Sequence, residues 1–286
     1  MLLSVHSIYA QDTSNYNFYK GKVKDYSFFI KMDSLKAENY NNRAVYRLLL
    51  KENNEAIKDC NNAIMLKSNY SDAYFNRGLA EYNLKKFTKS VEDYLSAIKY
   101  KNNYLEAYTN LAAVYVELEN YDKAVDYYYS AIKIEPNDLN SHNGLGIIKY
   151  KMNDYKGAMD EYKKVIQIDS TYYNLYGNIG NVKLKLEDYQ GAIDDYSKAL
   201  QIDTTDSRIY YNIGLSYQKL NKYENAIFYY SKAINKNPNR ELDAYASRGD
   251  LRYHEAGDKE NACKDWNKAY ELGFQNSKIS IDKYCK

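Results

Sequence analysis

The sequence is poor in the residues that most often carry chemistry. Its 286 residues include three histidines, three cysteines and one tryptophan. The histidines, His6, His142 and His254, lie far apart, and no Cys/His cluster has the spacing of metal ligands. No glycine-rich loop of the phosphate-binding kind occurs, and no pair of carboxylates is set in a shared cleft pattern. The sequence therefore predicts a protein that is not an enzyme and that holds no cofactor or metal.

The chain also lacks an excess of charge of one sign and any long hydrophobic run. Forty basic residues face 38 acidic ones, for a formal net charge of +2. Without a basic stripe, a nucleic acid is not expected as a partner. The most apolar stretch, residues 2–9, is too short to cross a bilayer as a helix, so no membrane-spanning segment is expected.

The sequence is rich in tyrosine, with 36 residues, and many of these tyrosines recur with a fixed period. The period is 34 residues. Small residues keep it at Gly78, Ala112, Gly146, Gly180 and Gly214, and aromatic residues keep it at Tyr94, Tyr128, Tyr162, Tyr196 and Tyr230. A fixed period in this range is typical of a solenoid, in which each unit buries its apolar faces against its neighbours.

Residues 105–138 show what one unit contains. Apolar residues at helical spacing predict a first helix through Tyr115 and a second through Tyr128, and Pro136 ends the second because proline cannot donate to the helix ladder. Small residues allow the two helices to approach closely, and aromatic side chains fill the space beside the crossing. The unit is therefore predicted to be a pair of antiparallel helices.

This pattern resembles the tetratricopeptide repeat (TPR) family. The family's order of residue types is carried here by Tyr108, Leu111, Ala112, Tyr115, Ala124, Tyr128, Ala131 and Pro136. The resemblance implies an all-α fold, a right-handed superhelical solenoid of antiparallel helix pairs. It also implies a scaffold or adaptor that binds another protein or a peptide.

The repeat frame predicts the domain organisation. Seven repeats are expected at residues 37–70, 71–104, 105–138, 139–172, 173–206, 207–240 and 242–275. Residues 19–36 align with a second helix and read as a degenerate half-repeat cap. Residues 276–286 read as a C-terminal capping helix. Residues 1–18 read as a signal-peptide remnant or a disordered tail.

The first residues bear on localisation. The apolar run that ends in Ile8-Tyr9-Ala10, followed by Gln11, resembles the end of a secretory signal peptide with cleavage after Ala10. No Lys or Arg precedes it, which departs from that pattern. We expect export to the periplasmic or extracellular side of a bacterial envelope, and a cytoplasmic protein if residues 1–10 are not a signal remnant.

One of the three cysteines lies in the first repeat and the other two lie near the C-terminus. Cys60 takes the place that a repeated tyrosine has elsewhere and is expected to be a buried packing residue. Cys263 and Cys285 both fall in the C-terminal cap. In an exported chain a disulfide between them would hold the closing helix to the last repeat, whereas in a reducing compartment both would be free thiols.

The resemblance places the binding surface on the first helix of each repeat, which lines the concave face in the family. The side chains expected there are largely apolar and aromatic: Phe75, Leu79, Tyr82, Thr109, Ala113, Val116, Asn143, Ile147, Tyr150, Asn181, Leu184, Tyr211 and Leu215. Such a groove suits a helix or extended segment with aliphatic anchors. The alternative is that these side chains are half-buried between repeats and bind nothing in particular.

One well-known binding mode of the family is not expected. Members that grip a C-terminal carboxylate have lysines at groove positions where this chain has none. The asparagines at the sixth position of several repeats are interpreted as structural, bonding backbone between repeats; they are Asn42, Asn76, Asn110, Asn178 and Asn212.

The sequence thus predicts a non-enzymatic TPR scaffold with an apolar, aromatic concave groove. The alternative is a structural or self-associating component of an envelope assembly, a homo-oligomer joined through the ends of the array or through a tyrosine-rich convex face. That face would comprise Tyr127, Tyr128, Tyr129, Tyr229 and Tyr230.

Overall fold

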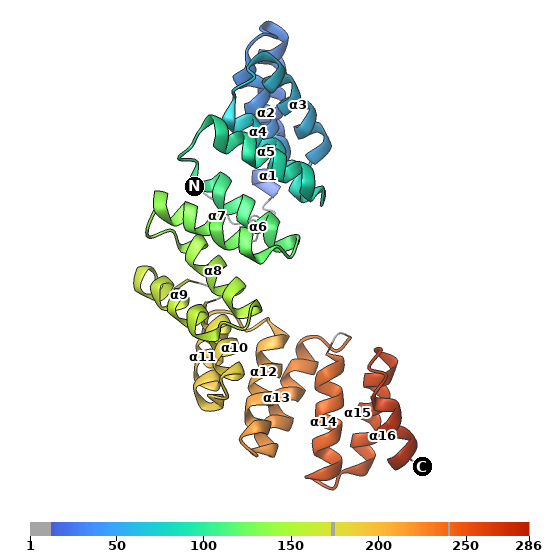
Figure 1. Cartoon of the computed structure of the whole chain (residues 1–286). Coiled ribbons are helices and arrows are strands. Elements are labelled where there is room, and N and C mark those ends of the chain that lie inside the picture. Colours follow the sequence, from blue (N-terminus) through green and yellow to red (C-terminus); the bar gives the residue numbers. More distant parts are fainter. Residues whose placement is uncertain (1–12, 173–174, 240, 286) are drawn as a thin grey trace. The chain divides into compact units, whose positions relative to one another are not determined.

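The fold is all-α, as a computed structural model of the chain shows. The structure describes residues 13–172, 175–239 and 241–285. Within these residues it contains sixteen helices and no strand. Within each of the two compact units defined below, successive helices run antiparallel and stack in chain order (Figure 1). The expected solenoid of helix pairs is confirmed. None of the described helices combines the length and the apolar character that crossing a bilayer requires.

The chain divides into two compact units, residues 1–148 and 149–286. The first contains α1 (Thr13–Met32), α2 (Ala37–Leu49), α3 (Asn53–Leu66), α4 (Ser71–Asn83), α5 (Phe87–Tyr100), α6 (Leu105–Glu117), α7 (Tyr121–Ile134) and most of α8 (Leu139–Lys151). The second contains the end of α8, then α9 (Tyr155–Ile168), α10 (Leu175–Lys185), α11 (Tyr189–Ile202), α12 (Ser207–Lys219), α13 (Tyr223–Lys236), α14 (Leu242–His254), α15 (Lys259–Glu271) and α16 (Ser277–Tyr284).

Two helices fall within each repeat range taken from the sequence, and we call them helix A and helix B. The N-terminal boundary differs from the expected one. Helix α1 begins at Thr13, so residues 13–18 belong to a helix and not to a tail. Residues 1–12, which include the expected signal remnant, lie outside the described residues, as does residue 286 at the other end.

The turn from helix A to helix B has the same backbone in six repeats. One residue in each turn takes a left-handed conformation with φ between 55° and 63°: Lys51, Lys85, Glu119, Asn153, Glu187 and Asn221. The next N–H donates to a carbonyl five residues earlier, as from Asn120 to Tyr115. This bond pattern ends helix A and satisfies its last carbonyls. In the last repeat, where the turn between the helices is one residue longer, Gly257 takes the left-handed place.

In the repeats after the first, an aromatic ring of helix B lies in the core on a small residue of helix A. Trp266, Tyr94, Tyr162, Tyr196 and Tyr230 are almost fully buried. A Cβ added at Gly180 or at Gly214 would lie 2.6 or 2.8 Å from the Tyr196 or Tyr230 ring. The periodic glycines therefore make room for a ring, rather than only for the opposite helix. Cys60 and His142 are buried as well, which confirms both as packing residues.

A buried ion pair joins helix A to helix B in five repeats. Its carboxylate lies on helix B with at most 6% of its side chain exposed, and its cation comes from helix A. The closest contacts measure 2.6–2.7 Å in the pairs Arg43–Asp59, Arg77–Asp93, Lys149–Glu161, Lys183–Asp195 and Arg248–Asp265. These pairs fix the angle and register of the two helices.

The other two repeats replace the ion pair by stacked tyrosines. Tyr115 stacks on Tyr127 with centroids 5.5 Å apart, and Tyr217 stacks on Tyr229 at 5.4 Å. In the 34-residue frame these rings occupy the places that the charged residues have elsewhere. The same contact between helices is thus made either by charge or by aromatic stacking.

A disulfide and three aromatic rings hold the C-terminal cap. Cys263 of α15 and Cys285 after α16 are bonded, with their Cα atoms 5.7 Å apart. Tyr284 of α16 packs on Tyr253 at 4.3 Å and on Trp266 at 5.9 Å. Helix α16 therefore covers the last repeat's core, which would otherwise face water.

Candidate functional site

The residues predicted to line a groove lie on helix A of successive repeats, in α4, α6, α8, α10 and α12. Twelve of the thirteen are half-buried and none is exposed. Thr109 is only 5% exposed, so its assignment to an accessible groove is wrong. Its hydroxyl donates to the carbonyl of Glu106 at 3.1 Å, which turns it toward its own helix.

The aromatic members of this set are the outer layer of the core. Phe75 lies 5.1 Å from Tyr104 and 5.6 Å from Tyr94, between ring centroids. Tyr211 lies 5.5 Å from Tyr230. Each ring thus presents one side to the surface while the other side packs on neighbouring rings. The surface is apolar but fixed in place by packing, and it has little conformational entropy to lose when it binds.

The tyrosine hydroxyls on this surface stay protonated at neutral pH. Burial raises the pKa of Tyr82, and the neighbouring carboxylate of Glu117 raises it further. Burial also raises the pKa of Tyr150 and of Tyr211. The phenols are therefore able to donate hydrogen bonds.

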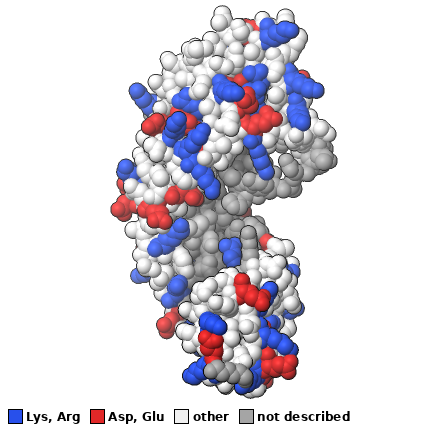
Figure 2. All heavy atoms as spheres, turned by 90° about the vertical axis from the view of Figure 1, so that its right-hand side faces the viewer, with Lys and Arg blue, Asp and Glu red and all other residues white. Residues whose placement is uncertain are grey.

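Acidic side chains border the aromatic rings in both units. Burial raises the pKa of Tyr104 and the charge of Asp72 raises it further, and the charge of Glu117 acts in the same way on Tyr82. In the second unit the charge of Asp243 acts on Tyr211. Helix A lysines such as Lys183 are held in ion pairs with helix B carboxylates. Acidic side chains therefore lie near the aromatic surface, and so does Lys101, whose Nζ lies 3.9 Å from the centroid of the Tyr104 ring. Basic and acidic side chains are mixed over the face in Figure 2.

The sixth-position asparagines connect repeats, but through other partners than expected. Asn76 donates to the side chain of Asn41 at 2.9 Å, and Asn212 donates to the side chain of Asn181 at 3.0 Å. The hypothesis that they bond backbone is wrong for these two. Because Asn181 also accepts from Tyr196 at 2.7 Å, it is a structural residue as well as a predicted groove residue.

The prediction of an exposed, tyrosine-rich convex face is also wrong for four of its five residues. Tyr128 and Tyr230 are buried, with 8% and 0% exposed. Tyr127 and Tyr229 are half-buried in the stacks between helices. Only Tyr129 of the five is exposed, so this set forms no surface for self-association.

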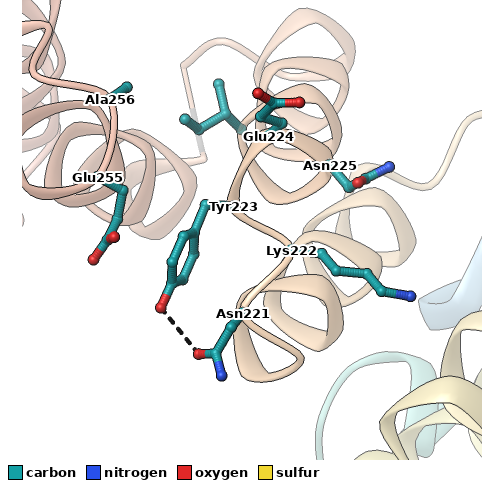
Figure 3. Close-up of a pocket in the computed structure, with 8 residues that line it drawn as sticks. Asn221, Lys222, Tyr223, Glu224, Asn225, Glu255 and Ala256 are labelled. Carbon is teal, nitrogen blue, oxygen red and sulfur yellow. Dashed lines mark hydrogen bonds between the residues drawn. The ribbon is translucent and has the colours of Figure 1, made fainter.

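A shallow depression lies beside the turn between α12 and α13, away from the predicted groove residues. It is lined by residues 221–225, Ile227, Glu255 and Ala256. Figure 3 shows the Tyr223 hydroxyl donating to Asn221 Oδ1, at 2.9 Å, along one side of it. The depression is open to solvent. We assign it no site.

Glu81 on α4 gives a pH-dependent prediction. It is 7% exposed, and its Oε2 accepts no hydrogen bond from the described residues. Burial raises its pKa, as does Asp93 nearby. Because the folded state favours the protonated acid, this group's contribution to stability is lost as pH rises past the usual glutamate range. Replacing Glu81 by Gln is expected to raise the free energy of unfolding at pH 7 by about 1 kcal/mol.

Urea unfolding at pH 7 and at pH 4 measures this effect. The stabilisation should shrink at pH 4, where the wild-type acid is protonated in both states. Glu92→Gln on the exposed side of α5 is the control and should change neither value. Equal stabilisation by Glu81→Gln at both pH values would contradict the account.

Comparison with protein families identifies the repeats. The family model described as Tetratricopeptide repeat matches residues 71–104, 105–138, 139–172 and 207–240, and one described as TPR repeat matches 180–221. Together they cover more than half of the chain. The chain belongs to the tetratricopeptide repeat family. As a TPR protein it is a scaffold for protein interaction, the general role of this family. No curated protein matches the sequence.

Solved structures share the TPR fold. A tetratricopeptide repeat protein from Parabacteroides merdae has a TM-score of 0.66 at 16% identity, covering 87% of this chain and 99% of that one. The Cut9–Hcn1 tetramer of the APC/C gives 0.67 at 18%, covering 83% of this chain but only 47% of that chain. YrrB, whose title describes an unusual peptide-binding site, gives 0.53 at 19%, covering 64% and 93%. At these identities the likeness concerns the fold alone.

Proposed function

We propose that this TPR protein is a non-enzymatic adaptor that binds an apolar segment of another protein on its helix A surface. The observation that carries the proposal is the set of half-buried apolar and aromatic side chains that each unit presents on its helices A, on α4, α6 and most of α8 in the first unit and on α10 and α12 in the second. Rings fixed by packing, such as Phe75 on Tyr104, give contact area with little loss of entropy.

The acidic border adds a preference for basic ligands. Asp72, Glu117 and Asp243 lie beside the aromatic rings, and each can pair with a Lys or Arg of a ligand. Complementary charge selects partners and speeds association more than it raises affinity. The proposed ligand is therefore a segment with aliphatic or aromatic anchors and flanking basic residues.

A double variant tests the surface in the first unit. Leu79→Asp with Ile147→Asp puts two charges among the apolar side chains without touching a fully buried residue. Affinity purification from the native source, with mass spectrometry, should recover partners with the wild type and lose them with the variant. Met65→Asp on α3, where the side chain is 78% exposed, is the control and should keep them.

The folded state of each variant is checked by circular dichroism and thermal unfolding. A folded double variant that keeps every partner would place the binding site elsewhere. Recovery of the bait alone with the wild type would favour the alternative, a self-associating component. Light scattering over a concentration range then decides, because self-association must grow with concentration.

We also infer that the protein is exported. The disulfide between Cys263 and Cys285 supports this, since disulfides persist mainly in oxidising compartments. The apolar run before Gln11 supports it from the sequence. Intact mass of the protein from its native source, with and without reductant, tests both points. Two free thiols together with an uncleaved N-terminus would overturn the inference.

A further inference from the structure

Helix α1 has two apolar faces, and the described residues that pack on it cover only one of them. The inner face carries Tyr19, Val23, Tyr26 and Ile30 at alternating spacings of four and three residues, and all four are half-buried. Tyr26 stacks on Tyr46 of α2, with centroids 5.8 Å apart. This face is the ordinary contact of a helix with the next one in the array.

The outer face exposes large apolar side chains. Phe18, Phe28, Phe29 and Met32 are 55%, 59%, 46% and 72% exposed, and Leu35 in the following turn is 78% exposed. In the repeat frame α1 takes the place of a helix B, and its outer face would lie against the helix A of its own repeat. The bulk of Phe29, where later repeats have alanine, opposes close approach of such a helix.

The same segment is the most basic part of this end of the chain. Residues 15–36 contain five lysines and two aspartates, a net charge of +3, whereas the entire chain has +2. Lys20, Lys24, Lys31 and Lys36 are exposed. The carboxylate of Asp25 on the outer face is paired with Lys22 at 3.4 Å. Exposed rings flanked by lysines thus form one continuous surface.

We propose that the outer face of α1 binds the surface of an anionic lipid bilayer. Phenylalanine and methionine side chains at the end of a helix can enter the boundary between headgroups and acyl chains, while flanking lysines contact the negative headgroups. A second copy of the chain fits less well. A symmetric contact would bring two surfaces of charge +3 together.

Binding through α1 would hold the first unit at the bilayer, since the helix is part of that unit. Arg43 of α2 donates to the Ser27 hydroxyl of α1 at 3.0 Å while it is also bonded to Asp59. The helix is therefore fixed to the first repeat and is not a separate tail. The proposal does not depend on the helix A surface or on its ligand.

Co-sedimentation of the full chain with vesicles tests the proposal. Binding is expected to vesicles of phosphatidylcholine and phosphatidylglycerol in equal parts, and to weaken with added salt. It should be much weaker to pure phosphatidylcholine. Phe28→Ser with Phe29→Ser is expected to reduce the bound fraction about tenfold. Phe228→Ser on α13, at a ring that is 54% exposed, is the matched control and should bind like the wild type.

Three outcomes would overturn the proposal. The first is absence of binding to either kind of vesicle. The second is binding that the double variant leaves unchanged. The third is a wild-type dimer in light scattering that the double variant converts to a monomer, without vesicle binding, which would show that a second copy covers the face.

Discussion

Replacing Asp59 by alanine is expected to lower the free energy of unfolding of the first repeat by about 3–5 kcal/mol. Asp59 is 1% exposed and receives hydrogen bonds from Arg43 at 2.6 and 2.9 Å and from Arg47 at 2.7 Å. Without the carboxylate, two guanidinium groups remain mostly buried beside each other, and the counter-charge that stays near them is the partly exposed carboxylate of Glu55, 4.0 Å from Arg47. The expected loss therefore measures the penalty of leaving two buried cations without their carboxylate, and not the net stabilisation that one ion pair gives.

Because a repeat array can unfold locally, the measurement should resolve single helices. Hydrogen exchange with mass spectrometry should show faster exchange in α2 and α3, with later repeats little changed. The triple variant Arg43→Leu, Arg47→Tyr, Asp59→Tyr gives the first repeat the residues that occupy the same places in the repeat 105–138, where Tyr115 and Tyr127 stack. Replacing a buried ion pair by well-packed side chains is often neutral. The triple variant should therefore be within about 1 kcal/mol of wild type, and a loss as large as that of Asp59→Ala would contradict this account.

The second large effect is expected at Gly144. A Cβ at this position would lie 2.6 Å from the Tyr128 hydroxyl oxygen and closer still to the ring. In most other repeats the ring rests on a glycine of its own helix A, but here that place holds Ala112, in the same buried cluster. Gly144→Ala should cost about 1–3 kcal/mol, even though alanine favours a helix more than glycine does.

A double-mutant cycle tests the cause. Ala112→Gly restores the space under the ring, so that Tyr128 can move away from a methyl group at position 144. The double variant should recover part of the loss, with a coupling of about 0.5–3 kcal/mol. Gly21→Ala is the control, since a Cβ there meets nothing within 4 Å. It should be neutral or stabilising, and a loss equal to that of Gly144→Ala would show that no clash is involved.

The period of the sequence was enough to predict the fold. Small residues and tyrosines at 34-residue intervals can satisfy a helix pair only if pairs stack, and no other arrangement keeps so many positions in phase. The period could not explain why position 144 holds a glycine, where the corresponding position of five other repeats holds an asparagine. That depends on where the Tyr128 ring lies, which changes with the single methyl group of Ala112.

The site was less predictable than the fold. Positions on helix A follow from the frame, but their exposure depends on the next repeat, and Thr109 proved buried. Tyr127 looked like an outward ring because it lies beside Tyr129 in the sequence. In the structure it stacks on Tyr115. The buried ion pairs were missed, although acidic residues on helix B, 12 to 17 residues after a basic residue on helix A, were a visible signal.

The acidic border of the surface was missed for a similar reason. Glu117 and Tyr82 come from the helices A of neighbouring repeats, so that only stacking brings them together, whereas Asp72 and Tyr104 come from opposite ends of one repeat. In the sequence Asp72 and Glu117 look like ordinary solvated charges. This border is what turns an apolar surface into one with a preferred ligand charge.

The most direct test of the proposed adaptor is binding of the purified chain to an array of immobilised peptides. The array varies aliphatic and aromatic anchors against flanking Lys, Arg, Asp or Glu. We expect enrichment of apolar peptides with basic flanks, and loss of that charge preference in the variant Asp72→Asn with Glu117→Gln. Binding of apolar peptides regardless of flank, or of none by a folded protein, would contradict the account.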